Sequence, residues 1–465
     1  MDLEVLKKPA AFLAILAVTA FWLSGIHFST PQILSTLVFL IVICGTLFYW
    51  QFRLSFAFGG LAILLATNLI DVSHIVEFAG LDIILFLVGM MTLIGYLEER
   101  HFFEYLVARV VDGVGERPYL LMAVLMGMAS FFAALVDEVT SILFMLSTMF
   151  HITKRYKVNP IPFLLMIVFT TNIGSSATAV GNPIGVMIAL RAHLTFADFL
   201  RWASPISVLC LGITIPICFF LFRNSLKDLG KKMKAEKGSL EETRHIAFKK
   251  SEIRTCWILF LATVACLILH AKLEHLLGLE KNSMLLGTAL GAGAISILLS
   301  GATARDFFMR RVDWWTLTFF MSLFASVGTL KYVGVTERIA AGMLAVGHQD
   351  PTSLLILFTS AISLLTGFMD NVLAVATFIP ILLELKEAGI YTFPFWWGML
   401  FGGTLYGNLT VIGSTANIVA MGMLEKEFKL HIKFMEWLKP GIIVSTLTIA
   451  VALWLIHLQI PLMPR

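Results

Sequence analysis

The sequence predicts an all-α polytopic membrane protein with two inverted repeats, about 11 transmembrane helices, two re-entrant hairpins and two broken helices. Three observations lead to this fold class. The 465 residues are 58% hydrophobic and only 14% charged, whereas soluble domains are roughly 45–50% apolar and about 25% charged. Long apolar segments follow one another along the chain. Polar interruptions of the same kind recur in both halves of the sequence.

The apolar segments have the length of membrane spans, since a helix needs about 20 apolar residues to cross the hydrocarbon core. The predicted crossings are 10–28, 33–50, 54–70, 81–97, 160–190, 203–222, 255–271, 283–300, 312–330, 393–424 and 437–457. The first follows two lysines but lacks a clear small-x-small cleavage site. We therefore expect a retained helix rather than a cleaved signal peptide.

Two further apolar segments, 119–150 and 352–383, are too long for one simple crossing. An acidic break interrupts each of them in the middle, reading VDEV at 136–139 and MDNV at 369–372. Polar backbone at membrane depth persists only where protein or a water-filled cavity surrounds it. Both segments are therefore predicted to be re-entrant hairpins.

The distribution of lysine and arginine predicts the orientation. Segment 223–254 holds ten Lys and Arg residues and should be cytoplasmic, together with the N-terminus and the basic turn 154–157. The C-terminus is then external. The membrane is expected to be the plasma (inner) membrane. The predicted division is 1–79 for N-terminal scaffold helices, 80–222 for the first repeat, 223–254 for a cytoplasmic linker, 255–311 for connecting helices and 312–457 for the second repeat.

The halves share a second feature, a break rich in small and polar residues some forty positions after each hairpin tip. It reads TNIGSSATAVGNP at 171–183 and YGNLTVIGSTAN at 406–417. Asp137 and Asp370 are 233 residues apart, and Thr178 and Thr410 are 232 apart. The predicted topology gives the two halves opposite directions. Inverted repeats with broken helices are typical of secondary transporters, with the site near the midplane.

The breaks supply ion ligands because each exposes two half-helix ends, whose N–H groups suit anions and whose carbonyls suit cations. The predicted ion-binding set is Asp137, Glu138, Asn172, Ser175, Ser176, Thr178, Asn182, Asp370, Asn371, Asn408, Thr410, Ser414, Thr415 and Asn417. Small residues also let membrane helices pack closely, and some hydroxyls only satisfy freed backbone groups.

The acidic residues are the costly members of this set, since a carboxylate at the bilayer centre costs about 2.5–3.5 kcal/mol. The predicted hairpins and broken helices contain no Lys or Arg. We expect Asp137 and Asp370 to exchange H⁺ for a cation, with Na⁺ bound there by the broken-helix carbonyls. Glu138, whose counterpart is the neutral Asn371, would tune them. The alternative is that the aspartates cap helices at the hairpin tips.

Other residues suggest structural roles. Glu98, Glu99, Arg100 and Arg109 are expected on an interfacial helix, and the tryptophans at membrane interfaces. The five cysteines form no CxxC pair, so neither disulfides nor a zinc site is predicted. No basic patch with interleaved aromatics indicates nucleic acid. No cofactor is expected beyond a coupling H⁺ or Na⁺.

The order of hairpins and breaks resembles the ion transporter superfamily, which includes arsenite-efflux permeases, NhaD-type sodium/proton antiporters, the melanosomal P protein and divalent-anion/sodium symporters. The resemblance covers about 80–457 and is greatest to the P-protein branch. In four places the chain departs from that branch: Ser175 and Ser176 replace Gly-(Gly/Ala/Thr), Asn182 replaces Asp, Ile184 and Gly185 replace Pro-Asn, and Asp-Glu replaces Asp-Asn in the first hairpin. The resemblance implies a scaffold, a moving transport domain, a homodimer and ion coupling through Asp137, Asp370 and the breaks.

The leading functional hypothesis is H⁺- or Na⁺-coupled transport of a small inorganic ion through an elevator-like mechanism. Na⁺/H⁺ antiport and arsenite or antimonite efflux both remain open, the latter with an ATPase subunit as partner if the chain is an arsenite pump. A dicarboxylate symporter is also an alternative. It is less suitable, because the predicted site contains the three acidic residues Asp137, Glu138 and Asp370. An ion channel is an alternative of another class. An intramembrane hydrolase would need a nucleophile–base pair or a His/Asp metal cluster at membrane depth, and the sequence provides neither.

Overall fold

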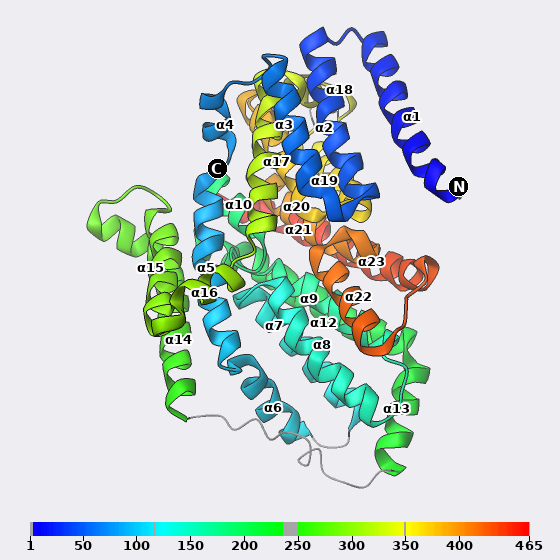
Figure 1. Cartoon of the computed structure of the whole chain (residues 1–465), viewed down its shortest axis with the longest axis vertical. Helices are drawn as coiled ribbons and strands as arrows, with labels where there is room; N and C mark the ends of the chain where they lie inside the picture. Colours follow the sequence, from blue (N-terminus) through cyan, green and yellow to red (C-terminus); the bar gives the residue numbers. More distant parts are fainter. Residues whose placement is uncertain (1–2, 115–116, 236–249, 348–349, 465) are drawn as a thin grey trace. The chain divides into compact units, whose positions relative to one another are not determined.

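The computed structural model describes residues 3–114, 117–235, 250–347 and 350–464, and the regular elements in these ranges are all helical (Figure 1). The first half contains α1 (Leu3–Gly25), α2 (Thr30–Phe48), α3 (Arg53–Ala66), α4 (Val72–Phe78), α5 (Leu81–Glu99), α6 (Phe102–Val114), α7 (Pro118–Leu135), α8 (Glu138–Arg155), α9 (Ile161–Ser175), α10 (Pro183–Ala192), α11 (Phe196–Asp198), α12 (Ser204–Leu221) and α13 (Arg223–Ala235). The predicted linker thus begins with a helix, and its middle, 236–249, lies outside the described residues.

The second half begins with the longest described helix. It contains α14 (Lys250–Leu277), α15 (Ser283–Leu299), α16 (Ala304–Arg311), α17 (Trp314–Tyr332), α18 (Val335–Val346), α19 (Pro351–Phe368), α20 (Asn371–Glu387), α21 (Phe393–Leu405), α22 (Thr415–Phe428) and α23 (Phe434–Gln459). Both predicted hairpins are present as helix pairs, α7–α8 and α19–α20, and each pair is interrupted at its acidic break. Both predicted broken helices are present as α9–α10 and α21–α22.

The number of single-helix crossings is smaller than the sequence suggests. Within the described ranges, seven helices are long and apolar enough to cross a membrane, and the bent pairs α15–α16 (115°) and α17–α18 (68°) raise this to nine. Other predicted crossings fall on shorter apolar helices, namely Ala11–Gly25, Trp50–Ala66, Ile161–Ser175 and Pro183–Ala192. The prediction of an all-α polytopic membrane protein is confirmed.

The chain folds into two compact units, which we describe separately. The first comprises Met1–Ile84, Asp313–Leu357 and Ala376–Thr392. Its core holds the buried residues Val38, Leu64, Leu69 and Ile70. Asp313 caps α17 by accepting a hydrogen bond from the Thr316 amide at 3.1 Å.

The second unit comprises Leu85–Val312, Phe358–Val375 and Phe393–Arg465. In it α9 packs against α7, α8 and α12 (Figure 1). The unit includes the tip of α7–α8, the tip of α19–α20 and both helix breaks. All residues of the predicted ion-binding set therefore belong to one compact unit.

The contact between α7 and α9 depends on a glycine. A Cβ added to Gly174 would lie 2.1 Å from the carbonyl oxygen of Ser130 and 2.4 Å from its Cα. Only glycine permits this approach of two helix backbones, which brings the first break against the first hairpin. The same arrangement recurs between α5 and α15, where a Cβ on Gly89 would lie 2.4 Å from the Ala289 carbonyl oxygen.

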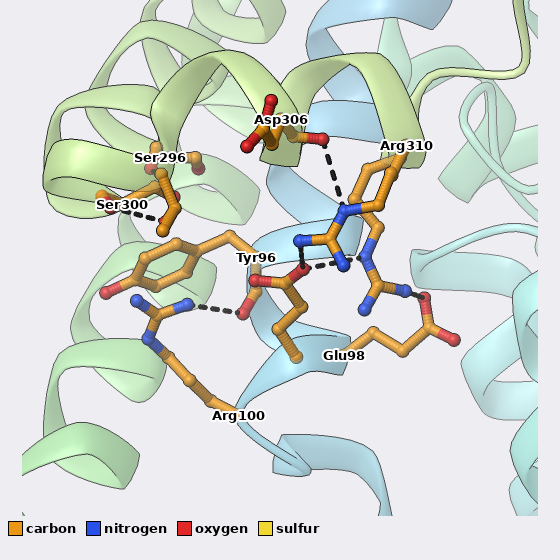
Figure 2. A network of polar contacts seen from close by, with 10 residues as sticks. Tyr96, Glu98, Arg100, Ser296, Ser300, Asp306 and Arg310 are labelled. Carbon is orange, nitrogen blue, oxygen red and sulfur yellow. Dashed lines mark hydrogen bonds and ion pairs between the residues drawn. The ribbon is translucent and has the colours of Figure 1, made fainter.

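A polar network joins the end of α5 to α16 (Figure 2). Arg311 donates to Glu98 Oε2 at 2.7 Å and to Glu99 Oε1 at 3.2 Å. Gly95 makes room for the arginine, since a Cβ there would lie 2.6 Å from the Arg311 Cβ. The two glutamates thus end α5 and bind arginines of α16, so their predicted place on an interfacial helix is wrong. That helix is α6, and it begins only at Phe102.

Replacing Arg311 by methionine should lower the free energy of unfolding by about 1–2 kcal/mol, because Glu98 would lose its arginine and Glu99 the nearer of its two, while the apolar stem stays packed. Arg310 is the matched control, since its side chain is 67% exposed and reaches Glu99 only at 3.5 Å. Arg310→Met should change stability by less than about 0.5 kcal/mol. Thermal unfolding in detergent measures both variants, and equal losses would contradict this assignment.

Candidate functional site

The two hairpin tips have the same construction. Asp137 begins α8, and its Oδ1 accepts hydrogen bonds from the amides of Val139 at 2.7 Å and Thr140 at 3.0 Å. Asp370 begins α20, and its Oδ1 accepts from the Val372 amide at 3.0 Å. Both aspartates therefore cap helix N-termini, where a carboxylate satisfies free amides and complements the helix dipole.

Each break is attached to its own hairpin through a threonine. The Thr178 hydroxyl donates to the carbonyl oxygen of Ala134, and the Thr410 hydroxyl donates to that of Gly367 at 2.6 Å. Both acceptors lie three residues before the aspartate at the tip. The matched threonines of the two repeats thus satisfy carbonyls left free where α7 and α19 end.

The second half of each broken helix begins with a polar cap. Asn182 Oδ1 accepts from the Gly185 amide at 2.8 Å and starts α10 before Pro183. Ser414, at the equivalent position, accepts from the Ala416 amide at 3.2 Å and starts α22. The preceding stretch of the second break consists of two short 3₁₀ turns, η5 (Tyr406–Asn408) and η6 (Val411–Gly413). The caps explain why both helices restart where they do, and Pro183 further favours the start of α10.

Glu138 lies where these elements meet. Its side chain is buried, with 2% exposed. Oε2 accepts a hydrogen bond from Ser175 at 3.1 Å, and Oε1 accepts from Ser414 at 3.2 Å and from Asn371 at 3.4 Å. One carboxylate of the first hairpin therefore contacts the first break, the second break and the second hairpin.

A second set of contacts surrounds Asn172. Its amide donates to Asn408 Oδ1 at 2.7 Å and to Asn417 Oδ1 at 2.9 Å. Its side-chain oxygen accepts from Ser414 at 3.3 Å. Asn417 in turn donates to the Gly407 and Thr410 carbonyls at 2.8 and 2.9 Å, which holds the second break in shape. Three buried amides from both repeats thus share one network.

The network leaves Glu138 surrounded by neutral donors. Among the described residues, no Lys, Arg or His forms an ion pair with its carboxylate. Asp370 lies on a neighbouring element, where its Oδ2 accepts from the Thr415 hydroxyl at 2.7 Å. A buried carboxylate ringed by hydroxyls and amides can bind a proton or an unhydrated cation, because each neutralises its charge.

The predicted residues separate into two groups. The structure brings together Glu138, Asn172, Ser175, Asn182, Asn371, Asn408, Ser414 and Asn417. The Asp137 carboxylate and the hydroxyls of Thr178 and Thr410 instead form hydrogen bonds with backbone groups. Asp370 accepts a hydrogen bond from Thr415. Ser176 donates to the Ile173 carbonyl at 2.7 Å.

Two residues contact the breaks without having been predicted there. Trp437 is fully buried and its Nε1 donates to the Asn408 carbonyl at 3.1 Å, so it is a core residue rather than an interface anchor. The Ser207 hydroxyl lies 2.8 Å from that of Ser176. No sequence pattern distinguishes them, since Trp437 sits at a span end and Ser207 inside an apolar run.

Comparison with solved structures shows the fold. The YdaH transporter of Alcanivorax borkumensis aligns with a TM-score of 0.58 over 87% of this chain and 89% of that one, at 16% identity. The description of that structure names an unusual topology. At this level of identity the likeness concerns the arrangement of helices alone.

Sequence relatives include uncharacterized transporters of bacteria and the P proteins of mammals. An uncharacterized transporter of Mycobacterium tuberculosis is 33% identical over 385 residues, covering 80% of this chain and 86% of the relative. The human P protein is 27% identical over 462 residues, covering 82% of this chain and 54% of that protein. The citrate transporter family model CitMHS matches residues 38–402 and 327–464. The resemblance to the ion transporter superfamily is thereby confirmed, and the chain is a transporter that belongs to the CitMHS citrate transporter family.

Proposed function

We propose that this chain is a secondary active transporter that moves a small inorganic cation in exchange for H⁺ or Na⁺, with Glu138 as the exchangeable charge. The main observation that supports this proposal is the position of Glu138. Its buried carboxylate accepts hydrogen bonds from both breaks and from the second hairpin. Asp137 and Asp370, which the sequence suggested for this role, act as helix caps in the structure.

Competition between a proton and a cation at one carboxylate provides the coupling. When Glu138 is protonated, it needs only hydrogen-bond partners, and Ser175, Ser414 and Asn371 are suitable. When it is ionised, burial makes a bare carboxylate costly, so a cation must accompany it. The two occupants therefore exclude each other. Na⁺ is the natural metal occupant, because hydroxyl, amide and carbonyl oxygens of the breaks can replace its water.

The architecture supports alternating access. Broken helices place their ends near the middle of the membrane, and transporters with this construction move one part against another around the site. The division into two compact units supports an elevator-like mechanism, since every predicted ion ligand belongs to a single unit. We further propose a homodimer in the plasma (inner) membrane, as the resemblance to the superfamily implies. The distribution of Lys and Arg predicts a cytoplasmic N-terminus.

A second candidate function follows from the family description, which names citrate. A citrate or dicarboxylate anion would meet Glu138 and Asp370, and the predicted hairpins and broken helices contain no Lys or Arg to receive it. Such an anion would have to enter with cations that neutralise its charge. Anion uptake that depends strictly on a co-transported cation would favour this function. Arsenite efflux is a third candidate, and stimulation by an ATPase subunit would be specific to it.

Flux into proteoliposomes with a panel of substrates tests these functions. With the chain reconstituted at fixed density, we expect an imposed pH gradient to drive Na⁺ or Li⁺ movement, whereas arsenite, antimonite, citrate and succinate should not move. Citrate uptake with cation dependence would replace the lead function by the second. Flux that collapses ion gradients without countertransport would show an ion channel and contradict secondary transport.

A further inference from the structure

A groove lies between α6 and α14, away from the network around Glu138. Its volume is about 560 Å³. The residues that line it are Tyr105, Arg109, Lys250, Ile253, Arg254, Trp257, Ile258 and Leu261. These residues all belong to the second compact unit, and the transport site uses none of them.

The described residues that line this groove carry charge of one sign. Arg109, Lys250 and Arg254 are exposed, and the described lining includes no Asp or Glu. The described part of the chain places no carboxylate in an ion pair with these three cations. Another groove of similar volume, about 580 Å³, differs in this respect because Glu436 accompanies Lys433 and Lys439. The groove between α6 and α14 therefore attracts an anion.

Polarity changes along α14 in a definite direction. Lys250 and Arg254 occupy its beginning, Trp257 follows one turn later, and Ile258 and Leu261 are 61% and 54% exposed beyond it. The distance from Lys250 to Leu261 along the helix is about 16 Å. The Trp257 ring packs edge-on against Phe102 at 5.2 Å, which fixes its orientation at the boundary between the two ends. Trp and Tyr prefer this boundary between headgroups and acyl chains.

We propose that the groove binds one anionic glycerophospholipid, with its phosphate between Arg109 and Arg254 and an acyl chain along Ile258 and Leu261. A free phosphate would bind the cations, but it would leave the exposed apolar half of the groove without a bound partner. A zwitterionic lipid would bring its own cation toward three basic residues. Juxtamembrane Lys and Arg clusters attract anionic lipids of the cytoplasmic leaflet, on which side we predict this groove to lie.

Native mass spectrometry of the full chain, extracted from vesicles of phosphatidylglycerol and phosphatidylcholine, tests this proposal. The wild type should retain one phosphatidylglycerol. The double variant Arg109→Gln/Arg254→Gln should lose about 30-fold in retention, which corresponds to about 2 kcal/mol. The matched control Lys227→Gln/Lys231→Gln removes two exposed cations from α13, which lies at the start of the same predicted cytoplasmic segment. It should retain the lipid as the wild type does.

Each other outcome overturns the proposal. Equal loss in both double variants would mean that general surface charge binds the lipid. Displacement of the lipid by inorganic phosphate would identify a phosphate-ion site instead. Retention of phosphatidylcholine at the same level, or of no lipid by the wild type, would exclude a specific headgroup site. Unchanged melting temperatures of the variants in detergent, which the exposure of the replaced residues leads us to expect, verify that they are folded.

Discussion

Glu138→Gln should make transport independent of the pH gradient. Glutamine has nearly the same shape and can keep contacts with Ser175, Ser414 and Asn371, but it neither ionises nor releases a proton. Coupled flux should fall on the order of 100-fold. This factor is near the upper end of those by which two coupled sites change each other's affinity. In the wild type, protons compete with the cation, so apparent cation affinity should rise with pH. In the variant this rise should disappear. Proteoliposome flux across a series of pH values measures both effects.

The two capping aspartates are the matched controls for this result. Asparagine caps helices about as well as aspartate does, so Asp137→Asn and Asp370→Asn should preserve the hairpin tips. Each should reduce flux less than Glu138→Gln and leave the pH dependence in place. Should Asp370→Asn abolish pH-driven flux while Glu138→Gln retains it, the exchangeable charge would be an aspartate, as the sequence by itself suggested. Wild-type behaviour of all three variants would move the coupling site to the hydroxyls of the breaks.

Gly174→Ala should destabilise the second compact unit severely. The added methyl carbon would lie 2.1 Å from the Ser130 carbonyl oxygen, a backbone atom that cannot turn away. Overpacking of this kind costs about 1–3 kcal/mol or more, because α9 must move off α7. We expect loss of monodisperse protein after extraction in detergent and a lower melting temperature.

Gly127 of α7 provides the control for this substitution. A Cβ on Gly127 would meet nothing within 4 Å. Alanine is the better helix former there, by about 1 kcal/mol. Gly127→Ala should therefore keep or raise the melting temperature, opposite in sign to Gly174→Ala. Similar behaviour of the two variants would mean that α7 and α9 do not approach closely at Gly174.

The architecture of the site could be predicted because both repeats mark it with the same residue types at the same spacing. Asp137 and Asp370 each indicate the start of a helix, and Asn182 before Pro183 indicates another. These residues act through their immediate neighbours along the chain. The breaks in 160–190 and 393–424 follow from local chemistry. These features require no knowledge of which helices are neighbours.

The roles within the site could not be predicted from local chemistry. Asp137 and Glu138 are adjacent in the sequence, and only the rotation of α8 decides which of them faces the breaks. The bond from Trp437 to Asn408 and the pairing of Arg311 with Glu98 depend on contacts between distant segments. His270, near the end of the predicted crossing 255–271, is fully buried in α14 with Nδ1 2.7 Å from the Leu267 carbonyl oxygen. Hydropathy reports the depth of a segment, not the direction of each side chain.

The neutral Asn371 at the position equivalent to Glu138 has an electrical consequence. Since only one of the two equivalent positions ionises, one occupant can carry at most one compensating charge through the centre of the repeats. A protein with both positions acidic could carry two. Each elementary charge that crosses the membrane is worth about 2.3 kcal/mol per 100 mV. Under the proposed function, the amide at residue 371 would thus limit the charge that exchanges at this pair of positions and that the membrane voltage can drive.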